Sequence, residues 1–117
     1  MEKKSGVNTQ ETLQQVASNV KKSLKEKHGD KLRSLEIPKD DLYEEYLQVL
    51  VVVPNRSVVS QYLRFSRENP KKAQEILVKH CVLTSKEEIM EDDALFYATA
   101  TTLIELIPIR EGKLGRL

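Results

Sequence analysis

The chain has no tryptophan, one cysteine and four glycines, and each shortage removes a class of function. With aromatic residues at only 5%, there is little from which to build a base-stacking platform for single-stranded nucleic acid. The four glycines are scattered along the chain, whereas a phosphate-binding loop needs glycines close together. We therefore expect no nucleotide site.

Cys81 is the only cysteine, so the chain can form no internal disulfide and no zinc site built on several thiolates. The N-terminus lacks the apolar core of a signal peptide, and no stretch approaches the roughly 20 apolar residues that cross a bilayer. These features predict a cytoplasmic protein with no membrane partner.

Charge is abundant but balanced, because 32% charged residues give a formal net charge of +1. This balance disfavours nucleic acid and anionic membranes as partners. The charge is nevertheless segregated: residues 1–29 hold six lysines against three glutamates, and residues 84–107 hold six acids against one lysine. Such polarity can orient assembly, although two solvated faces would show the same pattern.

The dominant feature is a valine-rich, mainly apolar run over residues 46–53 that ends at a proline. It predicts a strand over about residues 45–53 that is buried on both faces. Alternating apolar and polar residues at 33–37 predict a shorter strand, and the acidic connector between the two predicts an antiparallel hairpin. An exposed edge of this composition would aggregate, so we expect a helix or a second copy to cover it.

The N-terminal segment predicts a lysine-rich helix over about residues 9–28. Asn8 and Glu11 form a capping signal, and Gly29 supplies a stop after the basic last turn. The apolar stripe is narrow, so this helix is expected to pack lightly, to pair with another copy or to wait for a partner. The stripe consists of Leu13, Val16, Ala17, Val20 and Leu24.

Further helices are predicted over residues 56–67 and 70–82, followed by a short turn and a last helix that ends before Pro108. Small residues in the middle of the last helix suit close approach of another backbone. Each start carries a polar cap: Asn55, Asn69 followed by Pro70, Ser85, and Asp92 or Asp93.

Together these elements predict an α+β fold, predominantly helical, in which three or four helices cover a short antiparallel β-hairpin (33–37 and 45–53). The 117 residues, 39% of them hydrophobic, suffice for one modest core. We expect residues 1–29 to form an interaction arm, 30–110 a single compact domain and 111–117 a flexible tail.

The chain shows no pattern typical of catalysis, so we expect no enzyme. Adjacent helical residues such as His80 and Cys81 point about 100° apart, which argues against a nucleophile–base pair and for a buried thiol. His28 ends a helix, where a capping role is expected. The acidic cluster at 87–93 lacks the alternating ligands and glycine of a calcium loop, so we expect no metal and no cofactor.

Basic residues on the two middle helices leave a DNA-binding regulator of the helix-turn-helix kind open as an alternative. A solvated surface over an apolar floor would carry the same residues. They are Arg56, Arg64, Arg67, Lys71, Lys72 and Lys79.

The order of these signals resembles that of small phage and prophage tail assembly chaperones. The resemblance covers roughly residues 32–114 and leaves the lysine-rich N-terminal helix unexplained. It rests on a strand that ends at Pro54, Arg56-Ser57-Val58-Val59 opening a helix, Asn69-Pro70-Lys71-Lys72-Ala73 opening the next, His80-Cys81 at its end, Asp92-Asp93-Ala94-Leu95-Phe96, and a small-residue helix closing in Leu103-Ile104-Glu105-Leu106-Ile107.

The resemblance implies a non-enzymatic protein in the cytoplasm of a bacterial host. Such a chaperone coats a long helical tape-measure protein, often as an oligomer, and keeps it soluble until the tail tube polymerises around it. An accessory structural subunit of a larger assembly is a further alternative. The residues expected to contact the protein client lie on the N-terminal stripe and the last helix: Leu13, Val16, Val20, Leu24, Thr99, Leu103 and Leu106.

Overall fold

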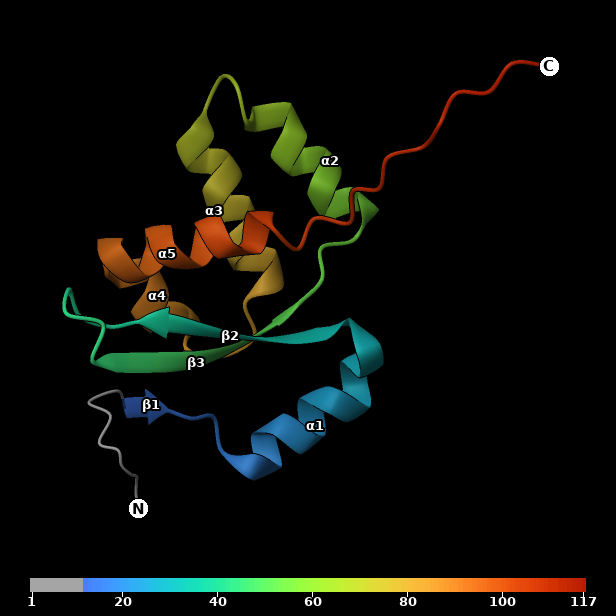
Figure 1. Cartoon of the computed structure of the whole chain (residues 1–117). Coiled ribbons are helices and arrows are strands. Elements are labelled where there is room, and N and C mark those ends of the chain that lie inside the picture. The colour runs from blue at the N-terminus through green and yellow to red at the C-terminus, as the bar shows by residue number, and fades with distance from the viewer. Residues whose placement is uncertain (1–11) are drawn as a thin grey trace.

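The computed structural model describes residues 12–117, which form a small three-stranded sheet and five α-helices (Figure 1). This confirms the expected helical α+β fold. The elements are β1 (Thr12–Gln14), α1 (Ser18–His28), a 3-10 turn (Gly29–Lys31), β2 (Leu32–Pro38), β3 (Glu45–Val52), α2 (Arg56–Phe65), α3 (Pro70–Cys81), α4 (Lys86–Glu91) and α5 (Asp93–Ile104).

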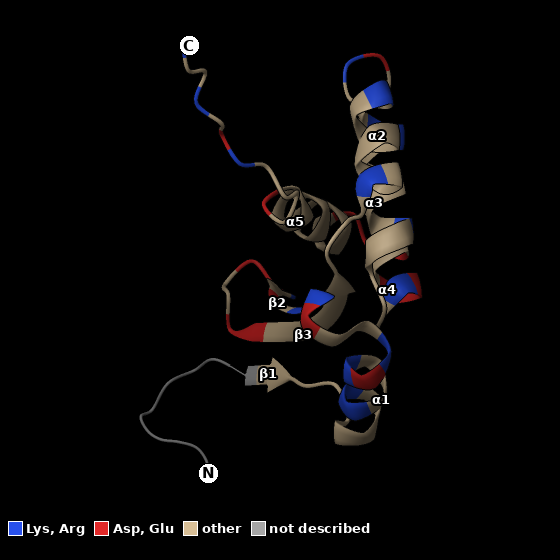
Figure 2. Cartoon of the chain, turned by 90° about the vertical axis from the view of Figure 1, so that its right-hand side faces the viewer, with Lys and Arg blue, Asp and Glu red and all other residues tan. Residues whose placement is uncertain are grey.

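The predicted hairpin forms, with β2 antiparallel to β3 and Leu35 opposite Val49. One face of the sheet packs against α3, α4 and α5, and there Leu47, Val49 and Val51 are fully buried. On the other face Leu50 is buried, whereas Tyr46, Gln48 and Val52 are half-buried. Burial of β3 on both faces is therefore only partly correct, because the helix on that second side, α1, is lysine-rich (Figures 1 and 2).

β3 is the central strand, and segments of its own chain pair with both of its edges. β2 takes one edge, while β1 pairs in parallel with the first half of the other edge, placing Leu13 beside Tyr46. The chain returning from α3 takes the second half: Leu83 N–H donates to Leu50 O at 2.9 Å, and Leu50 N–H donates to Thr84 Oγ1 at 3.0 Å. The expectation that a helix or a second copy covers the edge of this strand is therefore wrong, because other strands and loops of the same chain pair with it.

The predicted helix over residues 9–28 is wrong between residues 12 and 17, because residues 12–14 form β1 and α1 begins only at Ser18. Gln48 helps to fix this path, since its Oε1 accepts a hydrogen bond from Val16 N–H at 3.0 Å. The capping signal at Asn8 and Glu11 lies outside the described residues. Residues 12–14 thus belong to the sheet and not to a separate arm.

Side-chain caps start three of the helices as predicted. Asn55 Oδ1 accepts from Val58 N–H, Asn69 Oδ1 from Lys72 N–H, and Asp92 Oδ1 from Leu95 N–H. The capping box at Ser85 is wrong, because Ser85 adopts a left-handed conformation (φ 58°) and its side chain makes no cap hydrogen bond.

The last helix is shorter than predicted, because α5 ends at Ile104 and leaves Leu106 and Ile107, which were expected within the helix, beyond its end. The chain after Pro108 extends away from the body (Figure 1). None of the helices within residues 12–117 is long and apolar enough to span a bilayer.

Thr99 is a polar residue inside the core. Its side chain is fully buried on α5, and within the described chain its Oγ1 has no hydrogen-bond partner. A buried hydroxyl without a partner loses its hydration and gains nothing in return.

We predict that Thr99→Val, which keeps the side-chain shape and removes the hydroxyl, raises the free energy of unfolding by about 1 kcal/mol. Urea denaturation followed by circular dichroism would measure the change. Thr102→Val serves as the control and should give no gain, because the Thr102 hydroxyl donates to Ala98 O at 2.8 Å. A destabilised Thr99→Val variant would contradict this account.

Candidate interaction surfaces

The predicted client-binding residues of the N-terminal segment lie on two different elements. Leu13 is half-buried in β1, and Val16 is half-buried in the link to α1. On α1, Val20 is 38% exposed and Leu24 is half-buried. The four residues therefore do not form one helical stripe, and Val20 has the largest exposed fraction of the four.

α1 packs only lightly on the body, since none of its residues is buried. Its first residue has no side-chain cap, whereas its last turn is basic and ends at Gly29, whose φ of 58° favours glycine. Figure 2 shows lysines spread over this helix. α1 is thus an amphipathic helix whose apolar side is incompletely covered.

The structure corrects the predicted surface on the last helix. Thr99 and Leu103 are fully buried in the core, so neither can contact a client in this conformation. Leu106 is half-buried and packs against the core. The small residues of α5 permit close approach to this protein's own α3 and β2.

A groove of about 570 Å³ lies where the C-terminal ends of α1, β3 and α3 meet the start of α2. We call it the basic groove. Its floor is mainly apolar, and its rim carries several basic side chains. The lining residues are Lys27, His28, Lys31, Val52, Val53, Pro54, Asn55, Arg56, Val58, His80, Cys81 and Pro108.

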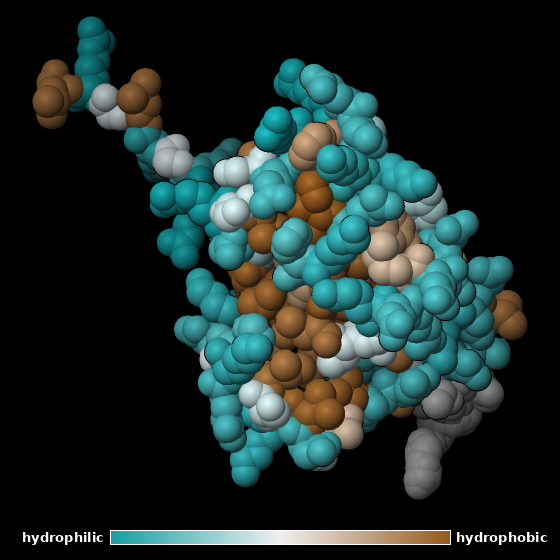
Figure 3. All heavy atoms as spheres, turned by 180° about the vertical axis from the view of Figure 1, so that it is seen from behind, coloured by the Kyte–Doolittle hydropathy of each residue, from teal (hydrophilic) through white to brown (hydrophobic). Residues whose placement is uncertain are grey.

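No acidic residue lines the basic groove, whereas Lys27, Lys31 and Arg56 line it as permanent cations. All three are exposed, so they remain hydrated and can meet an incoming negative charge. Seen from behind, hydrophobic side chains gather in one strip between polar ones (Figure 3). An apolar floor with cations at its rim suits an apolar segment flanked by acids.

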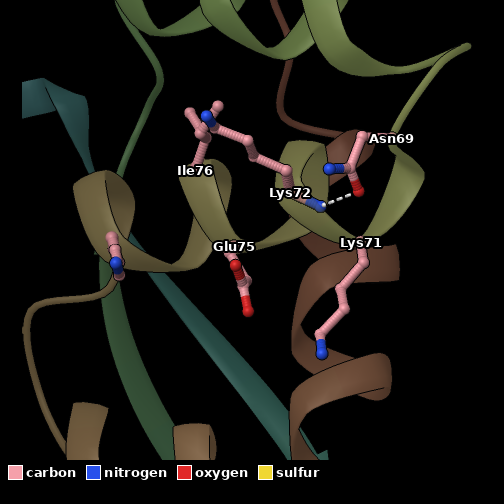
Figure 4. Close-up of a pocket in the computed structure, with 6 residues that line it drawn as sticks. Asn69, Lys71, Lys72, Glu75 and Ile76 are labelled. Atoms are coloured by element: carbon pink, nitrogen blue, oxygen red, sulfur yellow. Dashed lines mark hydrogen bonds between the residues drawn. The ribbon is translucent and has the colours of Figure 1, made fainter.

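A second hollow, of about 330 Å³, lies along α3 beneath the predicted basic face (Figure 4). Asn69 there caps α3, accepting from Lys72 N–H at 3.2 Å, and Lys72 Nζ lies 4.3 Å from the centroid of the Phe65 ring. Glu75 interrupts the basic surface between Lys71 and Lys79. Asn69 and Lys72, two of the polar residues that line this hollow, thus have structural roles.

His80 and Cys81 point in different directions, as expected. Cys81 is fully buried and His80 is exposed, so they form no nucleophile–base pair. Burial raises the pKa of the Cys81 thiol to about 11, against a smaller lowering by Lys86. The thiol therefore keeps its proton and behaves as a core side chain.

The acidic cluster on α4 and at the start of α5 is solvent-exposed. Asp92 caps α5, and Glu88 Oε2 lies 3.9 Å from Lys39 Nζ in a solvent-accessible ion pair. Among residues 12–117, no group of three or more His, Cys, Asp or Glu side chains is placed to hold a metal ion.

Comparisons with known proteins give a fold but no family. No family model and no curated protein matches this chain. A solved structure, that of the uncharacterised protein rbstp2171 from Bacillus stearothermophilus, has a TM-score of 0.59 at 17% identity over 82% of this chain and 99% of that chain. At this identity the likeness shows the fold alone.

Sequence reasoning missed the hairpin tip (residues 39–45) as a surface feature. Leu42 is 74% exposed and Tyr43 is 59% exposed, although both are large hydrophobic residues. The available signal was two adjacent apolar residues inside a turn that otherwise consists of charged residues. It indicated only a turn, because nothing local shows whether such residues fold inward.

We predict that thiol reagents modify Cys81 far more slowly in the folded protein than in urea at the same pH, because the buried thiol stays protonated. Between pH 9 and about 11 the folded state binds more protons at this site than the unfolded state. The stability of the native protein relative to Cys81→Ala should therefore fall as the pH rises through this range. Equal modification rates in the two states would contradict burial of the thiol.

Proposed function

We propose that this protein is a non-enzymatic assembly chaperone of the phage or prophage tail type, which binds a long helical protein client in the bacterial cytoplasm. The supporting observation is the state of α1, an amphipathic helix with no buried residue. An amphipathic helix whose apolar side is only partly covered can offer that side to an elongated helical client.

The attachment of α1 supports the same proposal. β1 holds the chain before α1 by pairing with β3, and the 3-10 turn leads directly from α1 into β2. Because α1 contributes nothing to the buried core, its apolar side can change partner at little cost in folding free energy. The lysines on its outer side would keep a loaded complex hydrated.

Client binding is centred on Val20 in this proposal. Val20 has a larger exposed fraction than Leu24, which lies one turn further along α1. Leu13 and Val16 support the helix from its N-terminal side, since Val16 is tied to Gln48.

We predict that Val20→Asp abolishes the capture of a client without unfolding the chaperone, because Val20 is already more than a third exposed. The test is co-expression with a long helical protein encoded beside this gene, affinity purification at moderate salt, and light scattering for stoichiometry. Asn19→Asp adds the same charge about 100° away around the helix and should leave capture intact.

Several copies held on one soluble client would support the proposal. If the wild-type protein remains a lone monomer or dimer and the client is insoluble, the accessory structural subunit becomes the better assignment. If Val20→Asp captures the client as well as wild type does, α1 is not the contact surface.

A DNA-binding regulator remains the second candidate, because all six basic residues of α2, α3 and their connection are exposed. α2 and α3 lie side by side as a helical hairpin, and Glu68 and Glu75 lie among the basic residues.

We expect no DNA binding that depends steeply on salt, since the acids interrupt the basic surface. Fluorescence anisotropy with a short duplex provides the measurement. A loss of affinity of roughly a thousandfold between about 50 and 200 mM salt would support the regulator instead. Binding of an apolar client should be nearly indifferent to the same change.

A further inference from the structure

Two surfaces of opposite character lie at the two ends of the β2–β3 hairpin. The hairpin tip precedes β3, and the basic groove receives the last residues of β3 and the chain that follows it. Figure 1 shows the tip at the far left and the end of β3 on the other side, beneath α2. The eight residues of β3 hold the two surfaces roughly 26 Å apart, so they cannot meet within one chain.

The hairpin tip is held in one conformation by its own hydrogen bonds. Asp40 Oδ1 accepts from Glu44 N–H at 2.9 Å and from Glu45 N–H at 3.3 Å, and Asp40 O accepts from Tyr43 N–H at 3.2 Å. Tyr43 has φ 57°, an uncommon conformation for a residue other than glycine. The surrounding bonds keep it there, and Leu42 and Tyr43 stay in solvent.

The charge of the tip is opposite to that of the groove. Asp41, Glu44 and Glu45 are exposed around the two apolar side chains. Figure 2 shows this acidic loop on the side of the molecule opposite the lysines of α1. Across the molecule, the groove offers an apolar floor, three cations and no acid.

We propose that the hairpin tip of one copy docks in the basic groove of a second copy, so that this protein self-associates head to tail. Leu42 and Tyr43 would cover the apolar floor, while the acids of the tip would face Lys27, Lys31 and Arg56. Because the two contacting surfaces differ, each added copy leaves a free tip and a free groove, and the assembly grows as a ring or a filament.

This proposal goes beyond client binding and does not depend on it. None of Leu13, Val16, Val20 and Leu24 lines the basic groove, so a copy could hold a client on α1 and a neighbour in the groove. The test uses the purified full chain alone, and its failure would leave the result with Val20→Asp untouched.

The experiment compares charge-reversed variants of exposed residues by sedimentation velocity over a concentration series. Lys27→Glu/Lys31→Glu reverses the groove, and Asp41→Lys/Glu44→Lys reverses the tip. Each variant alone should dissociate at least about tenfold more readily than wild type, and wild-type assemblies should weaken as salt rises to about 1 M. An equimolar mixture of the two variants should associate again, because every contact then pairs opposite charges.

Two matched controls exclude a general effect of charge. Lys22→Glu/Lys25→Glu reverses exposed lysines of α1 that do not line the groove. Glu87→Lys/Glu91→Lys reverses two exposed acids of α4 and leaves intact the ion pair between Glu88 and Lys39 of the hairpin tip. Neither should change self-association. A wild type that stays monomeric at every concentration, a mixture that fails to associate, or a loss of association with the α4 variant would each overturn the proposal.

Discussion

Val49 sits at the centre of β3 with no solvent exposure, and the need to cover this strand determines the rest of the architecture. A β-branched strand presents two edges of backbone polar groups and two faces of apolar surface, and each has to find a partner. Here β2 takes one edge, and β1 with the chain after α3 shares the other. Three helices cover one face. The second face is covered only by α1, which has no buried residue, so apolar side chains on this side stay partly exposed.

The weakly covered face is the physical basis of the proposed client contact. Residues buried between the sheet and α3, α4 and α5 cannot be exposed without opening the core. Thr99 and Leu103, on the inner side of α5, belong to that group. α1 carries no such penalty, because its apolar side chains are only partly covered. An interaction element with low local stability on a well-packed body can bind a partner while the fold persists.

The hairpin also separates charge along its own length. Its turn is acidic because it contains Asp40, Asp41, Glu44 and Glu45, and hydrogen bonds to Asp40 hold its conformation. Its other end is basic because α1 and the 3-10 turn bring Lys27 and Lys31 beside the end of β3. The cations come from a segment that is distant in sequence from Arg56, so folding assembles the groove. Self-association through these ends and client binding through α1 would use separate residues of one small chain.

The amino-acid sequence by itself determined the local parts of this protein. Asn55, Asn69 and Asp92 cap their helices because a cap involves residues only three positions apart, and the run at β3 is a strand because β-branched side chains suit a pleated surface. From these signals the helical α+β class and the antiparallel hairpin followed.

Only the tertiary structure decided the parts that depend on distant partners. β1 exists because β3 has a free edge beside residues 12–14, and that pairing outweighs the helical spacing of the N-terminal apolar residues. The small residues of α5 would suit close approach of a backbone from this chain or from another protein. The sequence could not show that the neighbour is this protein's own α3. The basic groove likewise could not be predicted, because its rim joins α1, the 3-10 turn and α2 through packing that no local pattern encodes.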